Sequence, residues 1–219
     1  QLLDIAGTGS VLATVLDHYA VDTRHQTLPT FRHCLPGLFY SAAYVGGAGI
    51  GFNRFGLDDS ECRRLELQAS APVSERNKLL FLPHLGGRHA PFDASMAGAF
   101  VGLDWSHDRT DQYRAMLESI AYEYAGFLRC MQAMQVPVDV GGVFSLGGGS
   151  NSALFGQIKA DVLGVPYRKL PATEYGVLGA ALLAGQGAGV FADLRQTASD
   201  WQRPVEAVWL PDASRHRFY

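Results

Sequence analysis

The first part of the chain carries short apolar runs that favour β-strands. Leu2–Ala6 and Val11–Leu16 lie on either side of the turn Gly7-Thr8-Gly9, so they are predicted to form a hairpin. Loop residues with prolines follow, and Leu38–Val45 is then a third strand, rich in aromatic residues. Three strands in succession predict a three-strand meander.

The middle of the chain contains one clear amphipathic helix. After Thr110, apolar residues recur at spacings of three and four: Met116, Leu117, Ile120, Ala121, Tyr124, Phe127, Leu128 and Met131. Upstream, Leu57–Leu67 has the pattern of a charged helix ended by Pro72. Leu79–Pro83 is a predicted strand, and His84–Leu103, rich in glycine and proline, is a predicted ordered loop.

The last third alternates strands and helices. Val143–Leu146 is a predicted strand, followed by a glycine turn and a helix that runs to Leu163. Pro166–Lys169 fits a short strand. Tyr175–Ala188 fits a helix whose small side chains predict close packing against a neighbour. Strands first, and then alternating helices and strands, indicate an α/β fold.

Composition and charge exclude several classes of protein. Of 219 residues, 47% are hydrophobic, which is enough for a substantial core, and the net charge of −3 argues against nucleic acid as a ligand. Apolar stretches are all shorter than the roughly 18 residues that a membrane helix needs. Cys34, Cys62 and Cys130 form no CxxC, so we expect buried, reduced cysteines and a cytoplasmic protein.

Glycine supplies the candidate chemistry. Three clusters follow predicted strands: Gly7-Thr8-Gly9, Gly46–Gly51 and Gly147-Gly148-Gly149-Ser150-Asn151. Each by itself is also explained by a tight turn, by close packing, or by a Ser or Asn that caps a helix. Together they favour a nucleotide site, since α/β sheets bind ligands at the carboxyl ends of their strands. GxxxxGK[ST] is absent and the dinucleotide spacing is incomplete, which disfavours a P-loop enzyme and an NAD-dependent dehydrogenase.

These clusters, in this order, resemble the carboxyl-terminal domain of FGGY-family carbohydrate kinases such as xylulokinase and glycerol kinase. The resemblance runs from about Asp4 to about Phe191. Its pieces are Ala6–Gly9, Gly46–Ala48 with Phe52–Arg54, Phe81–Pro83 with Ala90-Pro91, Gly98–Leu103, Leu146–Ser152 with Gln157, Ala160–Gly164, and Glu174–Ala181. The ordered set is specific, although each piece alone is common.

The resemblance implies an actin-like (ribonuclease H-like) ATPase domain with a mixed sheet, forming a single domain over residues 1–219. It implies ATP and Mg²⁺ as cofactors. Gly7, Thr8 and Gly9 would meet the β- and γ-phosphates, Gly46 and Gly47 would lie along the phosphates, and Gly147, Gly148, Gly149 and Asn151 would hold the adenosine. The family's catalytic aspartate lies upstream of Gln1 and its sugar-binding amino-terminal domain is absent, so this chain is expected to be an inactive half of an enzyme.

The expected reaction is phosphorylation of a sugar or polyol, most closely a pentulose such as xylulose. Ala97-Gly98 and Phe52 depart from the residues common in the family, and they leave the substrate open. The alternative is a catalytically silent nucleotide-binding or regulatory member of the same fold. No metal ligands are expected, since His84, His89 and Asp93 lack a fourth partner. Asp161 is expected to be a charged residue on the surface of a helix. Self-association into a homodimer is left open.

Overall fold

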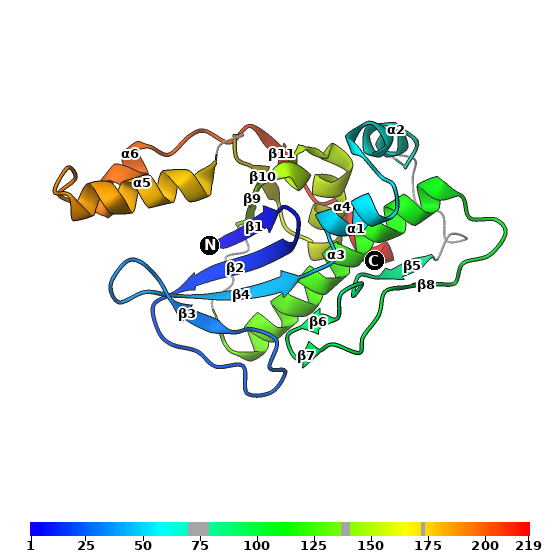
Figure 1. Cartoon of the computed structure of the whole chain (residues 1–219), viewed down its shortest axis with the longest axis horizontal. Coiled ribbons are helices and arrows are strands. Elements are labelled where there is room, and N and C mark those ends of the chain that lie inside the picture. The colour runs from blue at the N-terminus through cyan, green and yellow to red at the C-terminus, as the bar shows by residue number, and fades with distance from the viewer. Residues whose placement is uncertain (70–78, 137–140, 172–173) are drawn as a thin grey trace.

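A mixed seven-stranded sheet forms the centre of the molecule (Figure 1). The computed structural model describes residues 1–69, 79–136, 141–171 and 174–219. Across the sheet the strands are β11 (Ala207–Trp209), β10 (Tyr167–Lys169), β9 (Val143–Leu146), β1 (Leu2–Ala6), β2 (Ser10–Leu16), β4 (Phe39–Val45) and β3 (Thr30–Arg32).

The predicted meander is confirmed, and so is the mixed sheet. β1 and β2 form an antiparallel hairpin in which Ala6 pairs with Ser10, and β4 adds antiparallel to β2. β9 and β10 then add in parallel on the other side of β1. The edge strand β3 lies in a stretch that was expected to be loop. It is only three residues long, and the ring of its Phe31 stacks on Tyr40 with centroids 5.2 Å apart.

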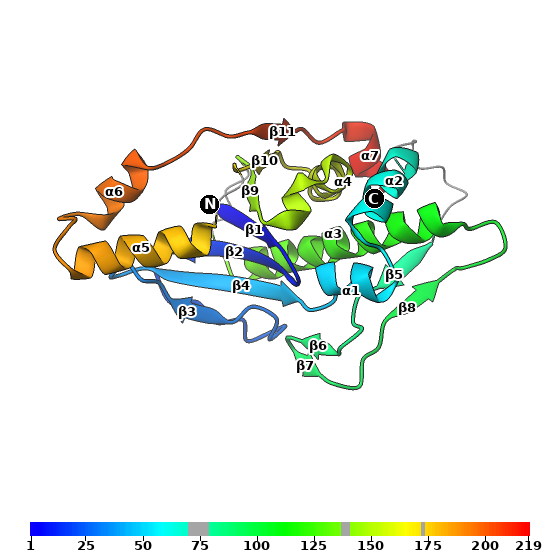
Figure 2. The same cartoon turned by 45° about the horizontal axis from the view of Figure 1, so that its top comes forward.

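Two helices cover one face of the sheet (Figure 2). α3 (Arg109–Ala133) starts at Asp108, whose carboxylate accepts hydrogen bonds from the amides of Thr110 and Asp111. All eight apolar residues predicted for its inner face are buried. α4 (Ala153–Leu163) ends at Gly164, which adopts a left-handed conformation. The core therefore lies between α3, α4 and the face of the sheet that carries Leu12 and Ala43.

Smaller elements stand at the carboxyl end of the meander. α1 (Gly49–Arg54) and α2 (Asp59–Ala69) follow β4, so the predicted charged helix is confirmed, while Pro72 lies outside the described residues. The stretch predicted as loop after residue 83 contains three short strands: β6 (Arg88–His89), β7 (Phe92–Asp93) and β8 (Ala99–Val101).

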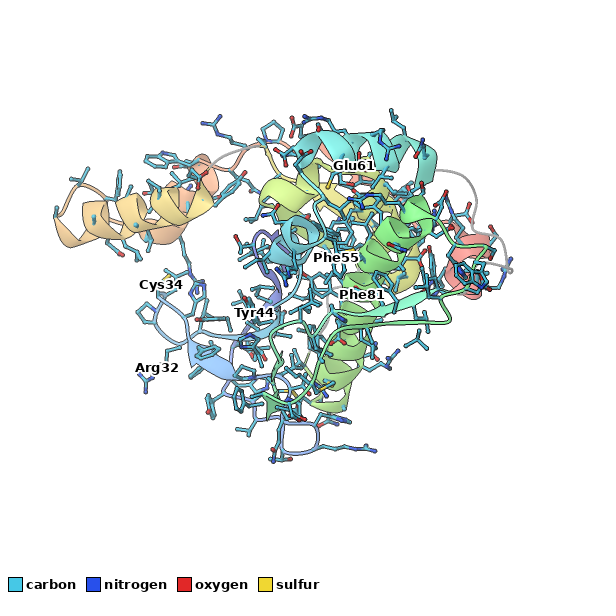
Figure 3. All side chains as sticks on the ribbon, turned by 45° about the vertical axis from the view of Figure 1, so that its right-hand side comes forward. Arg32, Cys34, Tyr44, Phe55, Glu61 and Phe81 are labelled. Carbon is cyan, nitrogen blue, oxygen red and sulfur yellow. The ribbon has the colours of Figure 1, made fainter. Side chains whose placement is uncertain are left out.

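An aromatic cluster anchors this part of the chain. β8 pairs with β5 (Leu80–Leu82), and the rings of Phe81 and Phe100 lie 4.7 Å apart. Phe55, next to α1, adds a third ring 5.8 Å from Phe81 (Figure 3). Spacing did not reveal β6, β7 and β8 because two or three residues are too few to show a period of two, whereas β5 lies within the predicted strand Leu79–Pro83.

The carboxyl-terminal helices are exposed over most of their surface. α5 (Tyr175–Gly187) forms as predicted, and the expected packing against a neighbour is limited to one helix. Only its Leu182 is buried, and Gly176, Gly179 and Gly187 face open space. α5 packs on α6 (Leu194–Asp200), and the pair extends beyond the sheet (Figures 1 and 3). Small side chains on a helix indicate that another segment packs close to it, but they do not indicate which segment.

The second face of the sheet is apolar and partly open. Ile5, Val11, Tyr44 and Leu146 occupy one row across β1, β2, β4 and β9, on the side opposite α3 and α4. Ile5 is 38% exposed and Tyr44 43%, and Val15 further along β2 is 45% exposed. Within the described residues, the helices that pack on the sheet contact its other face.

A buried ion pair crosses the core. Asp4 on β1 and Lys159 on α4 are both almost fully inaccessible to solvent, and their charged groups are in direct contact. The hydroxyls of Tyr124 and Ser145 also donate to the Asp4 carboxylate, at 2.7 and 2.9 Å. The Lys159 ammonium lies 4.0 Å from the centroid of the Phe155 ring. Asp4 is therefore a structural residue that joins β1, β9, α3 and α4.

Two further expectations about single residues were wrong. Asp161 is buried, because its carboxylate accepts hydrogen bonds from the Gln157 side chain and the Asp212 amide and pairs with Arg215 beneath α7 (Ala213–Phe218). The cysteines are not fully buried: Cys34 is exposed, and Cys62 and Cys130 are half-buried.

No helix of the described residues combines the length and the apolar character needed to cross a membrane.

Candidate functional site

A cavity of about 540 Å³ opens at the carboxyl ends of β1 and β9. Its walls come from the β1–β2 turn, from α1 and α2, and from the turn that leads into α4. Five residues predicted for the nucleotide site line it: Gly7, Thr8, Gly148, Gly149 and Asn151. Segments far apart in the sequence thus meet at the edge where the strands of an α/β sheet present ligand sites.

In the glycine turn after β9, two glycines allow close packing on β1 and one leaves space open. Gly147 has φ +90°, and a Cβ there would lie 2.5 Å from the Ala6 carbonyl oxygen. A Cβ at Gly149 would lie 2.8 Å from the Ala6 side chain. Gly148 has open space around its Cβ position. Gly147 and Gly149 therefore let this turn pack directly on β1, while the backbone of Gly148 faces the cavity.

This turn continues into a short 3-10 helix, η1 (Gly148–Asn151), before α4 starts. The cap of α4 is Ser152, whose hydroxyl oxygen accepts from the Phe155 amide at 3.0 Å. The expected Ser or Asn cap is therefore a serine, Ser152. Ser150 donates to the Gly147 carbonyl, and Asn151 lines the cavity.

The β1–β2 turn is held by α1. The Ile50 amide donates to the Thr8 carbonyl at 3.1 Å, and the Gly7 amide donates to the Gly9 carbonyl at 3.0 Å. A Cβ at Gly49 would approach the Gly7 carbonyl oxygen to 2.5 Å, so only glycine lets α1 come this close. Gly7 and Thr8 remain exposed, and the Thr8 hydroxyl is available to a ligand.

Four predicted residues are outside the lining of the cavity. Gly147 is the packing residue described above, and the Cβ position of Gly9 is taken by the Tyr44 ring. A side chain at Gly47 would collide with the Pro83 carbonyl, and one at Gly46 would lie 2.8 Å from the His89 ring nitrogen. Close packing explains these glycines, and their contact with a nucleotide stays a prediction.

Sequence reasoning missed the wall that α2 contributes. Asp59, Cys62, Arg63 and Glu66 line the cavity, together with Tyr113 of α3. Burial is the main cause that raises the pKa of the Cys62 thiol and the Tyr113 hydroxyl, so both are neutral near pH 7. A charged helix pattern is typical of a solvated surface, and no spacing distinguished this face from one that lines a cavity.

Glu66 connects α2 to the start of α4. Its carboxylate accepts hydrogen bonds from the Ser152 hydroxyl at 3.0 Å and from the Leu154 amide at 2.9 Å. An acidic group at a helix amino terminus also interacts favourably with the helix dipole. The two walls of the cavity are therefore fixed relative to each other.

The histidine cluster considered for a metal is separated by its partners. His84 lies 3.4 Å from the Glu123 carboxylate, and the His89 ring packs edge-on against Tyr44 with centroids 4.6 Å apart. Asp93 accepts from the amide and hydroxyl of Ser95. In the part of the chain that the structure describes, no group of three or more His, Cys, Asp or Glu side chains is arranged to hold a metal ion.

The strand order identifies the class of protein. β4, β2, β1, β9 and β10 form a three-strand meander followed by two parallel strands, with helices between them and a cavity at the strand ends. This is the actin-like, ribonuclease H-like ATPase fold. The sequence matches the carboxyl-terminal domain of the FGGY family of carbohydrate kinases over residues 4–188, and the chain belongs to that family.

Known relatives agree with this assignment. A xylulose kinase from Staphylococcus epidermidis is 29% identical and is matched over 97% of this chain and 43% of its own length. A glycerol kinase from Bordetella parapertussis is 30% identical, over 96% of this chain and 44% of its own length. The crystal structure of xylulose kinase from Rhodospirillum rubrum superposes with a TM-score of 0.82 at 22% identity, over the whole chain and 44% of that protein. The chain thus spans less than half the length of the relatives that it matches.

Proposed function

We propose that this chain is the ATP-binding half of a kinase that transfers the γ-phosphoryl group of ATP to a hydroxyl of a sugar or polyol. The observation that carries the proposal is the cavity at the ends of β1 and β9, with open backbone at Gly148 and an exposed Thr8. Relatives that are named xylulose kinase and glycerol kinase support the reaction class. A pentulose such as xylulose is the first substrate to test.

In this proposal each wall of the cavity has its own role. Gly7 and Thr8 meet the β- and γ-phosphates, and the Thr8 amide and hydroxyl are the kind of donors that phosphoryl transfer needs. Gly148, Gly149 and Asn151 hold the adenosine, and Gly148 leaves room for a flat ring against the backbone. Gly46 and Gly47 act indirectly, because they let the chain after β4 pack close to Pro83 and His89.

Mg²⁺ would enter with the nucleotide. The carboxylates that line the cavity belong to Asp59 and Glu66, and Glu66 already binds Ser152 and Leu154. The residues present do not form a cation site by themselves, and phosphate oxygens and water would supply the remaining ligands. The catalytic base and the sugar contacts are assigned to a further domain.

Two surfaces of this chain fit that further domain. The open sheet face around Ile5, Val15 and Tyr44 is apolar, and α5 exposes Val177 and Leu183. Exposed apolar areas of this kind mark surfaces that a partner covers. An amino-terminal half that packed on both surfaces would close over the cavity and exclude water from the reaction.

The test is calorimetric titration of this chain with ADP, ATP and NAD in Mg²⁺, beside an assay of ADP release by the two-domain protein over a panel of sugars and polyols. We expect the chain to bind adenine nucleotides at one site without turnover, and the two-domain protein to turn over one sugar or polyol. Preference for NAD would contradict the proposal. Binding without turnover by the two-domain protein would indicate the catalytically silent alternative.

A further inference from the structure

A second cavity, of about 480 Å³, shares no lining residue with the cavity at the ends of β1 and β9, which we call the nucleotide cavity after its proposed role. Three segments form it: the loop between β2 and β3, the segment around β6, and the second half of α3. Each segment contributes one arginine, Arg24, Arg88 and Arg129 respectively. We call this space the arginine cavity.

The charge in the arginine cavity is mainly positive. Glu123 also lines it, but its carboxylate lies 3.4 Å from the His84 ring nitrogen. Among the described residues, none of the three arginines has a carboxylate within ion-pair distance. Arg24 and Arg129 are exposed and Arg88 is half-buried, so solvent already screens their repulsion. An anion bound between them would be attracted by all three guanidinium groups.

Two of the arginines, Arg88 and Arg129, lie close enough to Cys130 to act on it. Cys130 lines the cavity, and burial and then the charge of Asp22 raise the pKa of its thiol, whereas the charges of Arg129 and Arg88 lower it. One side chain thus senses arginines from α3 and from β6, which are far apart in the sequence.

The loop that carries Arg24 is ordered before any ligand arrives. The buried Asp22 carboxylate accepts hydrogen bonds from the amides of His25 at 2.8 Å and Thr27 at 2.9 Å. Burial raises the pKa of Asp22, but the hydrogen bonds from the amides lower it by more, so the pKa lies below its usual value. The carboxylate therefore stays charged and keeps these hydrogen bonds at neutral pH. Fixed positions reduce the entropy that binding must overcome.

We propose that the arginine cavity binds the phosphate group of a small phosphorylated molecule. The planar guanidinium fork donates two parallel hydrogen bonds to phosphate oxygens, which makes arginine well suited to this group. Gly126 provides the space. It lines the cavity within α3, and its Cβ position has only the Arg129 guanidinium nearby, at 4.0 Å. This site is separate from the proposed nucleotide site, and it does not depend on the proposed function.

Titration of the ¹⁵N-labelled chain with inorganic phosphate, at constant ionic strength adjusted with chloride, tests this proposal. We expect saturable shifts at the amides of Thr27, Gly126 and Arg129, with and without Gly148→Trp. Arg129→Gln and Arg88→Gln should each weaken binding at least about tenfold, since each removes a charged hydrogen-bond donor. Arg203→Gln changes an exposed arginine outside the cavity, and it should leave binding unchanged.

A second variant tests the space rather than the charge. Gly126→Leu keeps every arginine and raises helix propensity, so α3 is retained while the side chain fills the cavity. It should abolish phosphate binding and leave the circular dichroism spectrum unchanged. Shifts restricted to Gly7 and Gly148, an equal response to chloride, or an equal loss of binding with Arg203→Gln would each overturn the proposal.

Discussion

At the scale of single residues, the Asp4–Lys159 pair is the most demanding feature of the core. Both charges are removed from water, so each depends on the other and on the hydroxyls of Tyr124 and Ser145. Because β1 carries the Gly7-Thr8 turn and α4 follows the Gly148 turn, the pair also holds together the two sides of the nucleotide cavity.

Replacing one partner of this pair should be severe. We predict that Lys159→Met lowers the free energy of unfolding by about 3–5 kcal/mol, because Asp4 is left charged and buried. Urea denaturation measures this loss. The double variant Asp4→Asn with Lys159→Met is the control, and it should recover part of the loss. A Lys159→Met protein as stable as the parent would contradict the ion pair.

The Asp4–Lys159 pair also shows that a sequence reveals local structure but not contacts between distant residues. Alternation along Leu2–Ala6 places Asp4 in a strand, but Lys159 lies 155 positions away and no local pattern connects the two residues. Asp161 was missed for the same reason, since its partners are Arg215 of α7 and Asp212, which caps that helix near the end of the chain. The glycine turns were predicted correctly because clusters of glycine are visible within a few consecutive residues of the sequence.

At the scale of elements, α3 organises the fold, and its start is set by one side chain. The Asp108 carboxylate accepts from the amides of Thr110 and Asp111, and the Asp111 side chain accepts from the Asp108 amide in return. This reciprocal arrangement satisfies amides that the first turn of a helix otherwise leaves unpaired.

We predict that Asp108→Ala lowers the free energy of unfolding by about 0.5–2 kcal/mol, because the cap is lost. Asp108→Asn keeps an oxygen acceptor and serves as the control, with a smaller loss. Thermal and urea denaturation of the two variants check this. Equal stability of Asp108→Ala and the parent would show that the cap contributes nothing.

Element boundaries were predictable where a period could be read. The strands of the meander and α3 agree with the expected ranges within one or two residues, because their alternation extends over at least five positions. β6, β7 and β8 are too short to give such a signal. For α5 the helix was correct, but its neighbour α6 could not be named, since small residues do not specify a partner.

At the scale of the whole molecule, the sheet is covered by helices on one face and is open and apolar on the other. Such a surface binds hydrophobic dyes. We predict that this chain binds the dye ANS in its native state, and that Val15→Lys combined with Ile5→Lys reduces the fluorescence.

Leu67→Lys is the matched control, because Leu67 on α2 is exposed but lies away from the sheet face. It should leave the dye fluorescence unchanged. Native protein without dye binding would show that another segment covers the face in solution, and would remove this support for a second domain.

The cavity at the ends of β1 and β9 involves all three scales, because single glycines, the ends of two strands and the family assignment each favour the proposed nucleotide site there. Gly148→Trp tests this most directly. Its Cβ position is open, so tryptophan should fill the cavity without disturbing the fold. Gly86→Trp is the control, at another open and exposed glycine in a loop outside the cavity.

Calorimetry with ADP and Mg²⁺ would compare the parent with both variants. The account predicts binding at one site in the parent and in Gly86→Trp, and no measurable binding in folded Gly148→Trp. Unchanged binding by Gly148→Trp would contradict it.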